Sequence, residues 1–140
     1  MVTNPVHNFY LLPGGGIESN ENTEEAAKRE CEEEINYGVD NIEIIAKTKE
    51  FRGRDKKEYT TYCVSAKITD QTSTDTRTDN EKELGMNAVW MELGEALKIF
   101  KDQEKKLKDG KVKFYNIGFN IVRDKLFFEK FKLICSVKNK

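Results

Sequence analysis

The sequence predicts a single α+β domain, residues 1–140, in which helices cover a sheet. A length of 140 residues is typical of one domain. The predicted elements run in the order strand, helix, several strands and two helices, and a sheet with an apolar face needs helices packed against it. Hydrophobic residues make up 37% of the chain and 14 residues are aromatic, which argues against wholesale disorder.

The first predicted elements are a short strand and a glycine-rich loop. Phe9–Leu12 is an apolar run, and Pro13 and the glycines Gly14, Gly15 and Gly16 follow it. Glycine permits backbone angles that other residues avoid and lets the backbone approach its neighbours closely. The pattern therefore predicts a strand that runs into an irregular loop.

A helix is predicted over residues 23–35. Asn22 is a good N-cap, and Glu25 three residues later completes a capping box. Asn36 and Gly38 tolerate the left-handed conformation that ends helices. One narrow apolar stripe recurs at four-residue spacing: Ala27, Cys31 and Ile35.

The remaining elements follow from composition and periodicity. Two runs rich in β-branched and aromatic residues predict strands, a polar stretch predicts a surface loop, and apolar residues at helical spacing predict two helices. In chain order we expect strands at 42–51 and 58–68 joined by a turn at 52–57, a loop at 70–83, a strand at 87–92 with Trp90 in the core, and helices at 93–108 and 115–134.

Charge and hydropathy exclude several classes of protein. Residues 1–100 hold 12 basic and 20 acidic side chains, whereas residues 101–140 hold 12 basic and 5 acidic ones. A domain that grips a nucleic-acid backbone has an overall basic surplus, so we expect no stable nucleic-acid binding. No run approaches the ~20 apolar residues of a membrane span. The three cysteines, far apart in the sequence, are expected to be reduced thiols in a cytoplasmic protein.

Eight glutamates lie between Gly14 and Glu34. Most of them fit a solvated helix face, but Glu30, Glu33 and Glu34 have i, i+3 and i+4 spacing and crowd one side of the helix. Like charges at this spacing destabilise an isolated helix. A hard divalent cation such as Mg²⁺, which takes oxygen ligands, would explain their convergence.

The wider pattern resembles the signature of the Nudix (MutT-like) hydrolase family. From Gly15 the chain has five residues, Glu21, seven residues and then Arg29-Glu30-Cys31-Glu32-Glu33-Glu34, which matches the fixed positions of the Nudix box. Cys31 takes the aliphatic position of the box. Where the family has a closing glycine, this chain has Asn36, which can form the same left-handed cap.

The resemblance implies a Nudix fold, an α/β/α sandwich with a mixed central sheet. Only twelve residues precede Pro13, so we expect the family's N-terminal strands to be absent or truncated, or the sheet to be completed by another part of the chain or by a partner. A sheet with an exposed edge would favour a homodimer.

The resemblance also implies an activity and its site. Nudix hydrolases cleave a pyrophosphate bond in a nucleoside diphosphate linked to another group, and they require Mg²⁺ or Mn²⁺. By the motif, Glu33 and Glu34 are metal ligands, and Glu30 is a ligand or the base that takes a proton from water. Glu21 and Arg29 pair to hold the loop against the helix, or form a structural salt bridge only.

Further candidates lie in and around the box. Gly14, Gly15 and Gly16 let the backbone approach metal or phosphate. Arg52 and Arg54 could bind a substrate phosphate, since a guanidinium matches phosphate geometry, although a solvated hairpin tip explains them as well. A fourth metal ligand could come from Glu81 or Glu83. The alternative to an enzyme is a Nudix-fold protein that binds or senses a nucleotide without turnover.

Overall fold

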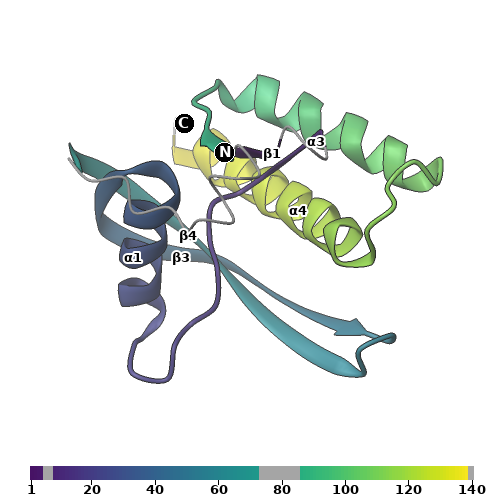
Figure 1. Ribbon diagram of the computed structural model, residues 1–140. Coiled ribbons are helices and arrows are strands. Elements are labelled where there is room, and N and C mark those ends of the chain that lie inside the picture. Colours follow the sequence, from purple (N-terminus) through teal and green to yellow (C-terminus); the bar gives the residue numbers. More distant parts are fainter. Residues whose placement is uncertain (5–7, 73–85, 139–140) are drawn as a thin grey trace. The chain divides into compact units, whose positions relative to one another are not determined.

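The computed structural model of the chain describes all residues except 5–7, 73–85 and 139–140. The described residues form two compact units. The first contains residues 1–43 and 65–91, and the second contains residues 44–64 and 92–140. Figure 1 shows the helices and strands coloured along the sequence.

The first unit contains a three-stranded sheet in the order β2-β1-β5. Strand β1 (Val2–Asn4) pairs antiparallel with β2 (Phe9–Leu11) and with β5 (Asn87–Ala88). Val2, which is buried, stands opposite Leu11 on one side and Ala88 on the other. Two strands therefore precede the glycine loop, and each is only three residues long.

Helix α1 (Thr23–Ile35) contacts β5 in the same unit. Its buried residues are Ala26 and Ile35, and Val39 just beyond the helix is buried as well. The helix has the predicted bounds, because the capping residues that define its two ends are local in sequence.

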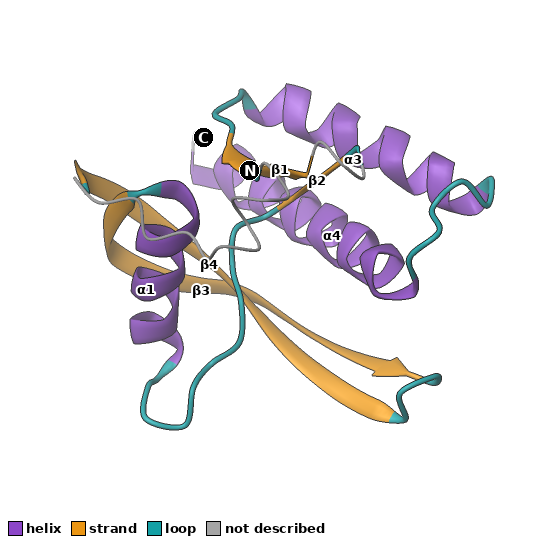
Figure 2. Cartoon of the chain, viewed as in Figure 1, coloured by secondary structure: helices purple, strands orange, loops and turns teal. Residues whose placement is uncertain are grey.

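Strands β3 (Tyr37–Arg52) and β4 (Lys57–Gln71) form a hairpin that passes from the first unit into the second (Figure 2). Both strands contain the predicted ones and are longer. Lys56 in the connecting turn has φ 52°, a left-handed angle that tight turns require.

The second unit is completed by helices α3 (Leu93–Lys108) and α4 (Tyr115–Lys138), which pack on each other. Phe100 is fully buried, and its ring lies 5.1 Å from that of Phe128. Lys125 of α4 donates to Glu104 of α3 at 2.9 Å. The buried apolar residues of this unit are Ala96, Leu97, Phe100, Ile121 and Phe127.

The predicted α+β class is confirmed, and three details of the prediction differ. The strand pairings that the structure describes within the three-stranded sheet are antiparallel, whereas we expected a mixed sheet. Strand β5 covers only residues 87–88 of the predicted 87–92. Trp90 is 56% exposed rather than in the core, because its edge contact with Tyr37 covers one side only.

Two further findings bear on the expected class of protein. Among the described residues no helix is long and apolar enough to cross a membrane. The predicted surface loop at 70–83 lies for the most part outside the described residues, as do Glu81 and Glu83.

Candidate active site

Helix α1 carries the acidic residues of the box, and its two caps fix where those residues lie. The side chain of Asn22 accepts from the backbone N–H groups of Glu24 and Glu25 at 2.9 and 3.1 Å, and Glu25 accepts from the Asn22 N–H at 2.8 Å. At the other end Asn36 has φ 58° and ψ 38°. Asn36 therefore adopts the left-handed cap that a glycine would supply.

Arg29 lies at the centre of the box and binds three carboxylates and one carbonyl. Its guanidinium holds Glu21 through two nitrogens, Nη2 at 2.6 Å and Nε at 3.1 Å. Its Nη1 donates to Glu30 at 2.8 Å and to Glu33 at 3.1 Å. Its Nη2 also donates to the carbonyl of Gly16 at 2.9 Å. The predicted Glu21–Arg29 pair is thus present, and it ties the glycine loop to α1.

The glycine loop lies directly against the carboxylates of the helix. The N–H of Gly14 donates to Oε2 of Glu34 at 2.7 Å, and Gly14 has φ 145°, an angle that side chains strain against. A methyl group at Gly15 would come within 2.6 Å of Cδ of Glu30. A side chain at position 15 would displace the Glu30 carboxylate, which occupies the space of a Cβ atom.

The electrostatics of this cluster are dominated by one cation among several anions. The Arg29 guanidinium lowers the pKa of the Glu21 carboxyl below its ordinary value. Burial raises the pKa of Glu30, and the hydrogen bond from Arg29 opposes that rise. The hydrogen bonds to Glu21 and Glu30 in turn raise the pKa of Arg29. One arginine faces three carboxylates, so the cluster keeps a surplus of negative charge that a further cation could neutralise.

The arrangement of these carboxylates differs from that of a formed metal site. Within the part of the chain that is described, no group of three or more His, Cys, Asp or Glu side chains is placed to hold a metal ion. The physical reason is visible in the contacts. Glu30 and Glu33 both turn to Nη1 of Arg29, and Glu34 turns to the N–H of Gly14. The oxygen donors themselves are those that hard divalent cations take.

Arg52 and Arg54 belong to the second unit, and the residues that they contact belong to it as well. Arg52 is buried: it pairs with Glu50, donates to Asn120 at 3.2 Å and lies over the rings of Tyr59 and Phe119. Such a guanidinium is already bound on several sides, and Arg52 is not part of a solvated hairpin tip. Arg54, by contrast, is exposed, and its guanidinium lies 4.5 Å from the centre of the Tyr115 ring.

The aromatic residues that hold these arginines were missed by the sequence analysis. Tyr115 and Phe119 begin α4, and their rings make an edge contact with centres 5.1 Å apart. Their four-residue spacing places both rings on one face of the helix. The sequence shows this spacing, but the arginines that the two rings contact lie more than sixty residues earlier, so the contacts could not be predicted from it.

The comparison with known families agrees with this geometry. A family model described as the NUDIX domain matches residues 3–115, which is most of the chain. The chain belongs to this family, whose members are hydrolases that cleave pyrophosphate bonds. The resemblance carried by the box is therefore confirmed, and with it the Nudix fold. No curated protein matched the chain.

Proposed function

We propose that this protein is a metal-dependent hydrolase that cleaves the pyrophosphate bond in a nucleoside diphosphate linked to another group. Family membership supports the class of reaction. The observation that carries the proposal is the convergence of Glu30 and Glu33 on one nitrogen of Arg29, which marks a point where two carboxylates already neutralise a cation. Residues 3–115 draw on both compact units, which supports one Nudix domain over the whole chain.

The carboxylates of Glu30, Glu33 and Glu34 would hold Mg²⁺ or Mn²⁺, since these ions take oxygen ligands and usually keep waters and substrate phosphates in their shell. When bound, such an ion polarises a phosphoryl oxygen and lowers the pKa of a water. Glu30 serves either as a ligand or as the group that accepts the proton of the attacking water.

Arg29 and Glu21 act through the other residues. Their two-nitrogen pairing, together with the bond from Arg29 to the Gly16 carbonyl, holds the glycine loop on α1. We propose that Arg29 keeps these two contacts and gives up Glu33 when the metal binds. The glycine backbone would then border the phosphates of the substrate, with Gly14, Gly15 and Gly16 leaving room for them.

The two hairpin arginines do not support a role in substrate binding equally. The guanidinium of Arg52 is held by Glu50 and Asn120, so it has less capacity for a phosphate. Arg54 has no hydrogen-bond acceptor for its guanidinium among the described residues, and it is the better candidate for an anion.

The alternative function is binding of a nucleotide without turnover. The contacts of Arg29 with both Glu30 and Glu33 favour it, because an arginine that stays between these carboxylates would exclude a metal from them. In that case the protein would bind its ligand equally well with and without divalent ions.

The deciding experiment measures two quantities on the same protein. The first is the affinity for Mn²⁺, measured by calorimetry without nucleotide. The second is release of nucleoside monophosphate from a panel of nucleoside diphosphate derivatives with Mg²⁺ or Mn²⁺. Glu33→Gln tests the site, and Glu24→Gln is the control, since Glu24 lies on the same helix and its side chain forms an ion pair only with the half-exposed Lys28 among the described residues.

We expect the wild type and Glu24→Gln to bind Mn²⁺ and to turn over at least one substrate, and Glu33→Gln to lose both properties while remaining folded. Mn²⁺ binding without turnover of any compound would overturn the proposed hydrolase activity. Failure of the folded wild type to bind Mn²⁺ would overturn the proposed metal site.

The free thiols of Cys31, Cys63 and Cys135 support the cytoplasmic location that we propose for this activity.

A further inference from the structure

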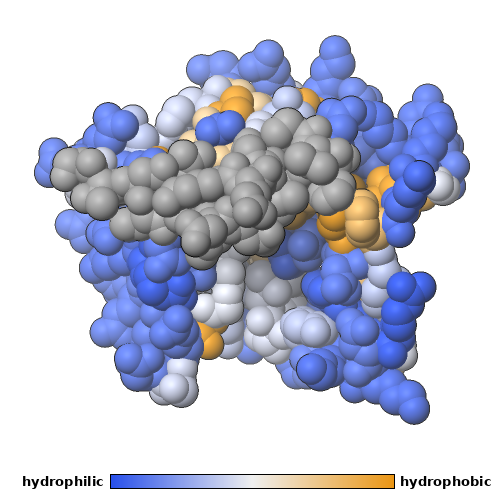
Figure 3. Space-filling model, in the orientation of Figure 1, coloured by the Kyte–Doolittle hydropathy of each residue, from blue (hydrophilic) through white to orange (hydrophobic). Residues whose placement is uncertain are grey.

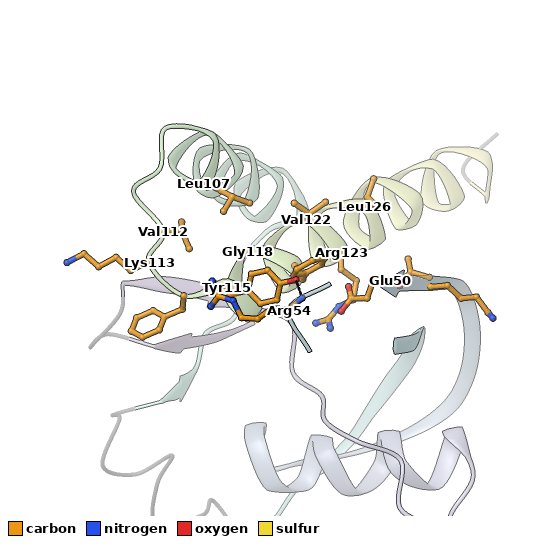
Figure 4. Close-up of a pocket in the computed structure, with 14 residues that line it drawn as sticks. Glu50, Arg54, Leu107, Val112, Lys113, Tyr115, Gly118, Val122, Arg123 and Leu126 are labelled. Atoms are coloured by element: carbon orange, nitrogen blue, oxygen red, sulfur yellow. Dashed lines mark hydrogen bonds between the residues drawn. The ribbon is translucent and has the colours of Figure 1, made fainter. Parts of the chain in front are cut away.

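The second unit contains a pocket of about 620 Å³ between the end of the hairpin and the start of helix α4 (Figure 4). Residues between Thr48 and Arg54 form one wall, and residues between Leu107 and Leu126 form the rest. All of them belong to the second unit, so the pocket shares no residue with the Nudix box. Its volume lies within the range of sites for small organic ligands, about 300–1,000 Å³.

The wall contributed by the helices is mainly apolar. Apart from Lys113, Arg123 and Gly118 its side chains are aliphatic or aromatic, and several remain exposed: Phe114 at 49%, Val122 at 37% and Leu126 at 48%. In Figure 3 an orange patch interrupts the hydrophilic surface near the connection between α3 and α4. Apolar surface that borders a pocket favours a ligand with an apolar body, because burial of that body removes both surfaces from water.

The charged side chains of the pocket differ in whether they already have partners. Lys49 pairs with Glu58 at 2.9 Å, and Arg123 pairs with Asp124 at 2.7 Å. The remaining acid of the wall, Glu50, is neutralised by Arg52. These ions balance one another and leave no net charge for a ligand.

Arg54 is the exception. Its backbone N–H donates to the hydroxyl of Tyr115 at 3.2 Å, and its guanidinium lies over the same ring. Among the described residues its guanidinium has no hydrogen-bond acceptor, and Figure 4 shows the side chain lying along Tyr115. The ring holds the cation in place while its N–H donors stay available. Lys113 also lacks a partner in this part of the chain, but in Figure 4 its side chain points away from the pocket.

A second polar group of the wall also lacks a partner. Oγ1 of Thr48 is buried and has no hydrogen-bond partner among the described residues. A buried hydroxyl without a partner costs free energy, of the order of 1–3 kcal/mol. Thr48 lines the pocket, so a ligand bound there would lie beside the residue that carries this hydroxyl.

We propose that this pocket binds a small organic anion with an apolar body, the anionic group against the guanidinium of Arg54 and the body against the apolar wall of α4. A carboxylate on an aliphatic chain and a phosphate on an aromatic nucleoside share this chemistry. Inorganic phosphate has the charge without the body and cannot fill the apolar wall. The proposal does not rest on the proposed hydrolase activity.

The test is calorimetric titration of the full chain in EDTA, so that no divalent ion bound at the box contributes. The probes are octanoate, AMP and inorganic phosphate. Each is titrated into the wild type, Arg54→Gln and Lys57→Gln. Lys57 is an exposed residue at the start of β4 that does not line the pocket, so its variant loses the same charge from the same hairpin.

We expect octanoate or AMP to bind the wild type and Lys57→Gln with similar affinity, and Arg54→Gln to bind at least about tenfold more weakly, as for loss of a charge-assisted hydrogen bond. The probe that binds identifies whether the body is aliphatic or aromatic. The proposal fails if neither probe binds, if Arg54→Gln binds as well as the wild type, or if phosphate alone binds as tightly. Val122→Gln, which adds a polar group to the apolar wall, is expected to weaken binding without removing the cation.

Discussion

The backbone of Gly15 lies against the carboxylate of Glu30, so closely that a methyl group at position 15 would come within 2.8 Å of Oε2. The same carboxylate accepts from Arg29, which in turn holds the carbonyl of Gly16. Loop and helix therefore constrain each other at the acid that the proposed chemistry requires. This contact predicts that alanine has different effects at position 15 and at position 16 of the loop.

Gly15→Ala is expected to displace the Glu30 carboxylate with only a small loss of stability, because the end of a flexible side chain can move aside. It is also expected to lower metal-dependent turnover, since a displacement of a catalytic group by ~1 Å can cost on the order of a hundredfold. Gly16→Ala is the matched control, because a methyl group there meets no atom within 4 Å among the described residues. Urea unfolding and initial rates measure the two effects, and equal behaviour of the two variants would contradict the close contact.

Arg29→Gln is expected to destabilise the protein, because it leaves the Glu21 and Glu30 carboxylates without their cation. Lys28→Gln removes the neighbouring positive charge, which pairs only with the exposed Glu24 among the described residues, and should destabilise the protein less than Arg29→Gln does. Urea unfolding of both variants at pH 7 tests the difference. A larger loss for Lys28→Gln would show that Arg29 does not hold the loop.

Arg52→Gln is expected to cost about 1–3 kcal/mol of stability, because it leaves the half-buried Glu50 carboxylate without its ion-pair partner. The exposed Lys57 again offers a control, since Lys57→Gln removes a charge from the same hairpin without breaking a buried pair. The free energies of unfolding of the two variants give the comparison. Similar small losses of unfolding free energy in both variants would contradict the pairing of Arg52 with Glu50 and would leave Arg52 available to bind a ligand.

The Glu104–Lys125 contact between α3 and α4 should make stability depend on pH. The hydrogen bond from Lys125 lowers the pKa of Glu104 in the folded protein below its ordinary value of 4.5. Its contribution is therefore present above about pH 4.5 and is lost as the pH falls through the lowered pKa. Because the pair is only partly shielded from solvent, we expect less than about 1 kcal/mol.

Glu104→Gln removes this contribution. The difference in unfolding free energy between the wild type and Glu104→Gln should shrink as the pH is lowered from 7 toward 3. Asp102→Asn is the control, since Asp102 is exposed on the same helix and has no ion-pair partner among the described residues. A difference for Glu104→Gln that stays constant with pH would contradict the pairing.

Cys63 is expected to react slowly with iodoacetamide in the folded protein. Burial raises the pKa of its thiol to about 11. At pH 8 the thiolate is then about a thousandth of the total, against roughly a quarter for an unfolded chain with the ordinary pKa of about 8.5. Mass spectrometry of the labelled peptide, in buffer and in urea, measures the ratio. Equal labelling under both conditions would show that the thiol is not shielded.

Features set by neighbours in the sequence could be predicted from the sequence. Helix α1 begins after Asn22 and ends before Asn36 as expected, because both capping groups act within one helical turn. The spacing from Gly15 to Glu34 could be matched to the Nudix box because the motif lies within one short stretch of the sequence. The pairing of Val2 with Ala88 could not be predicted, since register between distant short strands depends on the whole fold.

The candidate site divides in the same way. By itself the sequence determined which carboxylates crowd one side of α1, because helical periodicity places Glu30, Glu33 and Glu34 there. Only the tertiary structure decided that Arg29 meets the Gly16 carbonyl, that Glu34 meets the Gly14 N–H, and that Arg52 is buried while Arg54 is not. Helical spacing is a property of consecutive residues, whereas burial and ion pairing depend on which distant segments pack together, and that depends on the total free energy of the fold.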